Sequence, residues 1–175
     1  MLRATMDGDK EVVEALLDKG ASPNINDMGV TSFLVAAGVG PGSRGGTGLA
    51  AATSVGGPVN RDLMELLLAH GADVNAQVTG TFTYSMRVAR APSANEGKTA
   101  LHIAAQSGRV DIVRYLLEKG ARTDIADAEG HKPADLIGVR FEGETGPGVD
   151  PATQAGIRAT LLEGRRERQS QPDIR

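Results

Sequence analysis

Several stretches of the chain contain residue types whose spacing could support chemistry. The run Gly40-Pro41-Gly42-Ser43-Arg44-Gly45 has the glycine spacing of loops that hold phosphate groups against helix N–H donors. Such a loop must follow a strand and open a helix, whereas this one follows a helical pattern and contains a proline. We therefore expect residues 40–45 to form a surface loop, and a phosphate site is the alternative.

The histidines and acidic residues give no complete catalytic or metal-binding pattern. His70, His102 and His131 fall at different places in the chain, and none has a second histidine or a carboxylate at the sequence spacing of metal ligands. Asp127 and Glu129 resemble the start of a calcium loop whose remaining ligand positions are absent. No G-x-S-x-G motif is present. We expect no catalytic residue, no cofactor and no metal ion, and therefore no enzyme.

Composition argues against several other classes of protein. The chain has 175 residues, and 19 Lys and Arg nearly balance 22 Asp and Glu, which gives a net charge of −3. This balance and an aromatic content of 3% do not suit a nucleic-acid binder. Cys is absent, so disulfides and thiolate chemistry are excluded. No long apolar run occurs and the first residues lack an apolar core, so we expect no membrane span and no targeting segment.

Internal repetition is the strongest pattern in the sequence. Three stretches with helical periodicity end in Gly-Ala at Gly20, Gly71 and Gly120, and they read VVEALLDKGASPNIN, LMELLLAHGADVNAQ and IVRYLLEKGARTDIA. A second pattern, GVTSFLVAAGVG, GKTALHIAAQSG and GHKPADLIG, recurs as well. Gly97 and Gly130, which open two copies of this pattern, are 33 residues apart. Repeats of this length predict units of paired helices that bury their apolar sides only by stacking on one another.

The third copy shows how each unit folds. Thr99 is placed to cap a helix over about 100–106, in which Ala104 and Ala105 allow a neighbouring helix to approach closely. A second helix follows, and Gly120 suits the left-handed residue that ends it. The buried side of this second helix comprises Val110, Ile112, Val113, Leu116 and Leu117, while Arg109, Asp111, Arg114 and Glu118 face water.

The stretch GKTALHIAAQSGRVDIVRYLLEKGARTDIAD resembles a full ankyrin repeat, and the other copies match the family in pieces. Thr99 and His102 match the Thr-Pro-Leu-His stretch of the family, with Ala100 in place of the proline. The resemblance implies an all-α fold, an ankyrin-repeat α-solenoid of about four units with β-hairpin turns. We place the units at about 1–26, 27–77, 95–127 and 128–163.

Three insertions interrupt the expected array, at about 41–59, 78–94 and 139–150. Gly20 and Gly71 are 51 residues apart and Gly71 and Gly120 are 49 apart, against a period of 33. The Gly, Ser and Pro content of the first insertion predicts a flexible loop. The second insertion alternates β-forming residues, which predicts that one hairpin turn is lengthened into a protruding ribbon.

The two ends of the array depart from the repeat pattern. The first unit begins inside its first helix, so we expect Leu2 and Val12 to be exposed on a side that has no neighbouring unit. The first unit is then either a degenerate cap or the edge of a longer array. Asp150, followed by proline, is expected to cap a terminal helix that ends near Glu163. The polar residues 164–175 are expected to be disordered.

The resemblance implies a non-catalytic module that binds a protein partner through its hairpin tips and its concave inner-helix face. The lengthened turn combines aromatic, Met and Arg side chains, the kinds that are enriched at interfaces. The candidate partner-binding residues are Phe82, Tyr84, Met86, Arg87 and Arg90. These side chains either contact a partner or pack back onto the first helices.

We expect the protein to be a monomer with no nucleic-acid partner, and the sequence leaves its compartment open. The alternative function is that of a structural or regulatory segment of a larger polypeptide, which packs on an adjoining domain.

Overall fold

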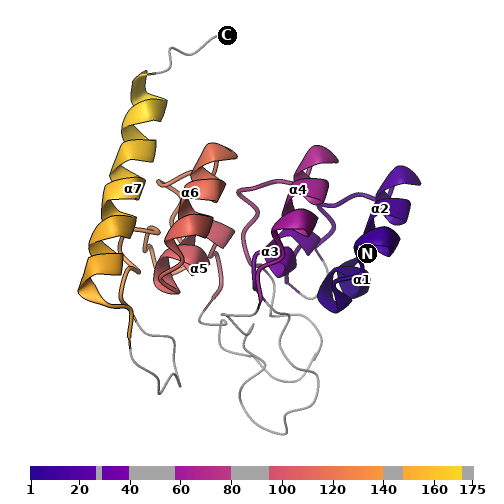
Figure 1. Cartoon of the computed structure of the whole chain (residues 1–175), viewed down its shortest axis with the longest axis horizontal. Helices are drawn as coiled ribbons and strands as arrows, with labels where there is room; N and C mark the ends of the chain where they lie inside the picture. The colour runs from indigo at the N-terminus through magenta and orange to yellow at the C-terminus, as the bar shows by residue number, and fades with distance from the viewer. Residues whose placement is uncertain (27–28, 40–57, 80–94, 140–147, 171–175) are drawn as a thin grey trace, which may run out of the picture. The chain divides into compact units, whose positions relative to one another are not determined.

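A computed structural model describes residues 1–26, 29–39, 58–79, 95–139 and 148–170 of the chain (Figure 1). The chain divides into two compact units, Met1–Ala100 and Leu101–Arg175. The helices in the described ranges are α1 (Leu2–Asp7), α2 (Lys10–Asp18), α3 (Ser32–Ala36), α4 (Arg61–Ala69), α5 (Ala100–Gln106), α6 (Val110–Glu118) and α7 (Pro151–Ser170). These ranges contain an isolated β-bridge but no sheet, and the expected all-α class is confirmed. Within them, no helix has the length and hydropathy needed to cross a membrane.

Unit 1, Met1–Ala100, contains two helix pairs that stack on each other (Figure 1). α1 packs on α2 and on α3, and α4 packs on α3 and on α2. The first helices of the two pairs therefore lie together, and so do the second helices. Their shared core contains side chains with no exposed surface, among them Val13, Phe33, Leu34, Leu63, Met64 and Leu67. Each pair thus covers the apolar side of the other, as repeat units must.

Short polar side chains start three helices of unit 1. Asp9 Oδ1 accepts a hydrogen bond from the backbone N–H of Val12 (3.1 Å), and Asn60 Oδ1 accepts one from that of Leu63 (3.1 Å). Thr31 caps α3 in the same way. Each side chain satisfies an N–H group that has no partner inside the helix, which fixes where the helix begins.

Glycine ends the second helix of each pair, as the sequence predicts. Gly20, Gly71 and Gly120 have φ values of 85°, 84° and 91°. Each donates its N–H group to the carbonyl oxygen three residues earlier, at 2.8 to 3.0 Å. Glycine adopts this left-handed conformation without the steric cost that a side chain would add.

The exposure expected for the first helix pair is confirmed for one residue and wrong for the other. Val12 is 45% exposed, whereas Leu2 is only 8% exposed. Because α1 packs on both α2 and α3, the Leu2 side chain is covered within unit 1.

The turn that precedes α5 has a paired stem. Gln77 and Thr99 form an antiparallel bridge. Val78 N donates to Lys98 O (2.9 Å), and Gly97 N donates to Val78 O (2.8 Å). The stem therefore has the hairpin pairing that the resemblance implies. The ribbon expected beyond it, like most of the other two insertions, lies outside the described residues.

Unit 2, Leu101–Arg175, ends in a long helix (Figure 1). α7 packs on α6, and its buried side chains include Ile157 and Leu161. Gly164 lies against Leu117, since an added Cβ would be 3.1 Å from the two methyl carbons of that leucine. The helix continues to Ser170, so the disorder expected after Glu163 is wrong for that stretch. Its Arg, Glu and Gln residues are good helix formers, and they extend a helix that packing has already nucleated.

The fourth unit has turns where its first helix was expected. Residues 133–138 form successive turns that end at Gly138, whose φ is 78°. Gln154 of α7 covers this glycine so closely that an added Cβ would lie 2.7 Å from its amide group. Val149 approaches Gly108 in the same manner, at 2.9 Å. Val149 and Gln154 thus pack closely on the backbone of two glycines of unit 2.

Two glycines within α7 give a matched pair of substitutions. An added Cβ at Gly156 would meet nothing within 4 Å, whereas at Gly164 it would press on Leu117. Gly156→Ala is expected to raise the free energy of unfolding by about 0.5–1 kcal/mol, because alanine loses less backbone entropy in a helix. Gly164→Ala is expected not to raise the free energy of unfolding, because its added methyl group would press on Leu117. Urea unfolding of both variants measures the difference, and equal gains would contradict the close packing of α7 on α6.

Asp150 caps α7 as expected and makes the start of the helix sensitive to acid. Its Oδ1 accepts a hydrogen bond from Thr153 N (2.9 Å), and its Oδ2 accepts one from the Thr153 hydroxyl group (2.6 Å). These bonds, the hydroxyl one first, hold the pKa of Asp150 below its ordinary value. Because the pKa of Asp150 is lower in the folded protein than in the unfolded chain, these bonds stabilise the folded protein fully at a pH above the ordinary pKa of Asp. This stabilisation is lost as the pH falls through the pKa that Asp150 has in the folded protein.

Asp150→Asn is expected to remove this part of the acid sensitivity. Asparagine remains a good N-cap residue but does not ionise. Below about pH 4, near the ordinary pKa of Asp, the wild type should lose more stability than the variant. Urea unfolding of both proteins over a pH series measures the difference. If the free energy of unfolding falls equally in both proteins at low pH, the Asp150 bonds do not contribute to the acid sensitivity.

Candidate functional site

The residues expected to contact a partner, Phe82, Tyr84, Met86, Arg87 and Arg90, lie outside the described residues. The Gly-rich run at 40–45 lies outside them as well. The structure does describe the turns at 22–26, 73–77 and 122–126 and the inner helices α1, α3 and α5.

The inner helices α3 and α5 expose almost no surface. Of the five residues of α3, only Val35 is half-buried and the others are buried, and all seven residues of α5 are buried. α1, in contrast, exposes Arg3, Met6 and Asp7. Each of these two helices therefore offers almost no exposed side-chain surface, which leaves the turns as the better described candidate.

Hydrogen bonds between side chains and backbone tie the first two turns of unit 1 together. Asn24 Nδ2 donates to Gly71 O (2.8 Å), and Asn24 Oδ1 accepts from Asp73 N (2.8 Å). Asn26 Nδ2 donates to Thr79 Oγ1 (2.6 Å). These bonds join the first copy of the repeat to the second. We define the turn surface as Asn24, Ile25, Asn26, Asp73 and Thr79.

Ile25 is the apolar centre of the turn surface. It lies between the two bonded asparagines in the chain and is 63% exposed, whereas the equivalent residues Ala76 and Ile125 are half-buried. The bonds of Asn24 and Asn26 hold the chain on either side of Ile25, so little backbone freedom would be lost if a partner bound there. Sequence reasoning misses Ile25, although an isoleucine between two asparagines in a turn is an available signal.

The corresponding turn of unit 2 is polar at its surface. Arg122 Nη2 donates to Asp124 Oδ2 (2.7 Å), and Arg122 Nε donates to Asp124 Oδ1 (3.1 Å). These hydrogen bonds and the charge of the carboxylate raise the pKa of Arg122. An exposed ion pair of this kind contributes little to stability or affinity. Among these three described turns, the exposed large apolar side chain is therefore Ile25, in unit 1.

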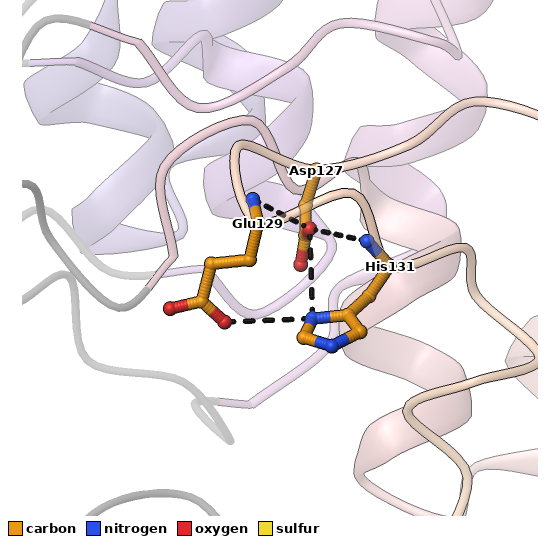
Figure 2. Close-up of side chains that lie close together, drawn as sticks. All are labelled: Asp127, Glu129 and His131. Atoms are coloured by element: carbon orange, nitrogen blue, oxygen red, sulfur yellow. Dashed lines mark hydrogen bonds and ion pairs between the residues drawn. The ribbon is translucent and has the colours of Figure 1, made fainter.

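Figure 2 shows three side chains, Asp127, Glu129 and His131, that lie close together in the turn that precedes the turns at 133–138 of unit 2. One possible ligand atom from each lies within 4.8 Å of the other two. His131 Nδ1 is 3.4 Å from Glu129 Oε2 and 3.8 Å from Asp127 Oδ1. The expectation that no carboxylate stands at ligand spacing from His131 is therefore wrong, because the turn brings together residues two and four positions apart.

The hydrogen bonds of the turn account for this cluster. The Asp127 side chain is 2% exposed, and its Oδ1 accepts from the backbone N–H groups of Glu129 (3.0 Å) and His131 (2.8 Å). Asp127 N donates to His131 O (2.8 Å), and His102 Nε2 lies 3.1 Å from the same carbonyl oxygen. The buried carboxylate thus shapes the turn, and the turn is fastened to α5.

Asp127→Ala is expected to lower the free energy of unfolding by about 1–3 kcal/mol, because two N–H groups of the turn lose their acceptor. Asp127→Asn keeps an acceptor oxygen and should lose less. Urea unfolding of both variants separates the contribution of the acceptor oxygen from that of the negative charge. If Asp127→Asn lowers the free energy of unfolding as much as Asp127→Ala does, the acceptor oxygen does not have the role assigned to it.

Comparison with known proteins gives one family and several relatives. The family model described as ankyrin repeats (3 copies) matches residues 1–127. Cyclin-dependent kinase 4 inhibitor B of Rattus norvegicus is 31% identical over 130 residues, which cover 74% of this chain and 73% of that protein. Protein phosphatase 1 regulatory subunit 27 of Mus musculus is 34% identical over 83 residues, which cover 47% of this chain and 44% of that protein. The chain therefore spans less than half of the phosphatase subunit.

Proposed function

Because the chain belongs to the ankyrin-repeat family, we propose that it is a non-catalytic scaffold that binds a protein partner through the turn surface of unit 1. Ankyrin repeats generally mediate protein–protein interaction. Two of the relatives are named as an inhibitor and as a regulatory subunit, which supports a regulatory rather than a catalytic role.

The main support for this proposal is the exposure of Ile25 on a turn that is held by hydrogen bonds to the next copy of the repeat. Asn24 and Asn26 are bonded to the next copy of the repeat, so the backbone on either side of Ile25 is held before any partner arrives. The Ile25 side chain can then enter an apolar pocket of a partner, while the asparagines and Thr79 form a polar rim. Interfaces with an apolar centre and a polar rim concentrate their binding energy in the central residue.

The lengthened turn extends this proposal. Phe82, Tyr84, Met86, Arg87 and Arg90 follow Thr79 closely in the sequence, and Thr79 belongs to the turn surface. We assign these side chains to the same partner contact on the basis of their composition. The burial of α3 and α5 gives no support to a contact on those two helices, so the proposal does not include them.

Affinity capture with three versions of the full chain tests the proposal. Wild type, Ile25→Glu and Leu162→Glu serve as bait; Ile25 and Leu162 are both exposed aliphatic residues, at 63% and 56%. We expect a protein captured by wild type and by Leu162→Glu to be lost or at least tenfold depleted with Ile25→Glu, the loss expected for a central contact residue. Equal capture by all three baits would reject the turn surface.

The contribution of the lengthened turn needs a separate variant. Replacement of residues 80–92 by a short Gly-Ser linker is expected to weaken binding of the captured partner by about tenfold or more, as the loss of interface anchors does. Calorimetric titration of the purified partner measures this change. An unchanged affinity would remove the lengthened turn from the contact while leaving the Ile25 result as the test of the turn surface.

A further inference from the structure

The turn at residues 127–131 brings together three possible metal ligands, Asp127, Glu129 and His131 (Figure 2). His131 Nδ1 lies 3.4 Å from Glu129 Oε2 and 3.8 Å from Asp127 Oδ1. Two atoms that each bind a tetrahedral zinc ion at about 2.0–2.2 Å lie roughly 3.3–3.6 Å apart. The spacing of the three side chains is therefore close to that of ligands around one ion, and the Glu129 side chain, which is 71% exposed, is free to move the remaining distance.

One oxygen of the buried Asp127 carboxylate lacks a hydrogen-bond donor. The Asp127 side chain is only 2% exposed, and the backbone N–H groups of Glu129 and His131 both donate to its Oδ1. Within the described part of the chain, Oδ2 accepts no hydrogen bond. In Figure 2 the carboxylate points toward the space between the Glu129 carboxylate and the His131 ring. A buried carboxylate oxygen without a donor is costly, and a cation bound to that oxygen removes the cost.

The charges of the two carboxylates are not balanced by a lysine or an arginine among the described residues. Asp127 and Glu129 form their ion pairs there with His131. The carboxylate of Asp124, in contrast, pairs with Arg122. Because an imidazole that binds a metal ion is neutral, the three side chains would present two negative charges to the ion. A divalent cation balances both charges.

The corresponding positions before Gly29 and Gly97 in the other copies lack this set of ligands. Aligned on Gly130, the residues at the three positions are Asn26, Met28 and Val30 in the first copy and Ala94, Glu96 and Lys98 in the next. Neither copy has a histidine or two carboxylates there, and the lysine of the later one would repel a cation. The repeat pattern therefore does not account for the set, which belongs to this one turn.

We propose that Asp127, Glu129 and His131 bind a zinc ion. The ligands are Asp127 Oδ2, one carboxylate oxygen of Glu129 and His131 Nδ1, and water takes the fourth position of the ion. The imidazole nitrogen favours Zn²⁺ over Ca²⁺ and Mg²⁺, which prefer oxygen ligands. The site departs from the sequence-based expectation that no metal ion binds. It is separate from the turn surface and does not depend on the proposed function.

Calorimetric titration of the full chain, prepared without a histidine tag, with zinc chloride tests the binding itself. We expect saturable binding of one Zn²⁺ ion per chain. The protein should also unfold at a higher temperature with the ion than without it, because the ion binds the folded turn. Ca²⁺ at the same concentration should not displace Zn²⁺. No saturable binding up to about 1 mM Zn²⁺, or displacement by Ca²⁺, would overturn the proposal.

Two substitutions at exposed positions identify the ligands. His131→Ala and Glu129→Gln should each weaken Zn²⁺ binding by about tenfold or more, because losing a ligand costs at least as much as losing a group that orients one. Their side chains are 47% and 71% exposed, so folding should be retained, and urea unfolding without the ion checks this. Asp127→Asn keeps an acceptor oxygen for the turn and should weaken Zn²⁺ binding as well. If Asp127→Asn does not fold, the two exposed variants decide.

His70→Ala is the matched control. His70 also lies beside a carboxylate, with Nε2 3.6 Å from Asp18 Oδ1, but its ion pairs among the described residues include one carboxylate rather than two. This variant should bind Zn²⁺ like the wild type, and so should Ile25→Glu, which separates this test from that of the turn surface. In proton NMR spectra, Zn²⁺ should shift the ring signals of His131 and leave those of His70 in place. Wild-type affinity in His131→Ala, or an equal loss in His70→Ala, would overturn the proposal.

Discussion

Phe33→Ala is expected to lower the free energy of unfolding by about 3–5 kcal/mol, the range found when a fully buried phenylalanine is truncated. Phe33 has no exposed surface and belongs to α3, which packs on both α1 and α4. The cavity would therefore lie where the two helix pairs of unit 1 meet. Because each pair depends on the other for burial, the substitution should weaken both pairs together. Urea unfolding followed by circular dichroism measures the loss.

The control for this prediction is Ile25→Ala. Ile25 is 63% exposed, so removing its side chain should change the free energy of unfolding by less than about 0.5 kcal/mol. Phe33→Leu provides an intermediate case, with an expected cost of about 1.5 kcal/mol, because much of the apolar volume is kept. A cost for Phe33→Ala no larger than that for Ile25→Ala would show that α3 is not the centre of the unit.

Ile157→Ala is expected to lower the free energy of unfolding by about 2–5 kcal/mol. Ile157 has no exposed surface and lies in α7, which packs on α6 in unit 2. Leu162, five residues later on the same helix, is 56% exposed, so Leu162→Ala should cost less than about 0.5 kcal/mol. Urea unfolding of the two variants compares buried and exposed sides of one helix, and equal costs would contradict the packing of α7 on α6.

Local patterns in the sequence predicted most of the helices. The periodicity and Gly120 place α6, and Asp150 caps α7 as expected. Thr31 and Asp9 also act as helix caps, as their residue types favour, although these two caps were not predicted. Each of these features depends on residues within a few positions of one another. Repetition along the chain then supplies the stacking, since a pair of short helices cannot bury its apolar sides alone.

Features that depend on contacts between distant residues were not predictable in the same way. The burial of Leu2 follows from the packing of α1 on α3, and the bonds of Asn24 and Asn26 join residues 47 and 53 positions apart. The approach of His131 to Asp127 depends on the path of one turn. In these cases the residue type is compatible with several environments, and tertiary contacts select one.

The continuation of α7 to Ser170 shows a different limit. Its last residues are polar, a composition that is typical of disordered tails, yet they are also good helix formers. Packing of Ile157 and Leu161 earlier in the helix removes the cost of nucleation, after which propagation requires only favourable propensity. Composition alone does not reveal whether such a nucleus exists.

Amide hydrogen exchange of the full chain, with and without the captured partner, tests the turn-surface account most directly. The account predicts slower exchange on binding in residues 22–26, which contain Asn24, Ile25 and Asn26, and in residues 72–79, which contain their hydrogen-bond partners Asp73 and Thr79. Exchange in the buried helix α5 should stay the same, because that helix is already covered. Unchanged exchange in both turns, with protection only elsewhere in the chain, would contradict it.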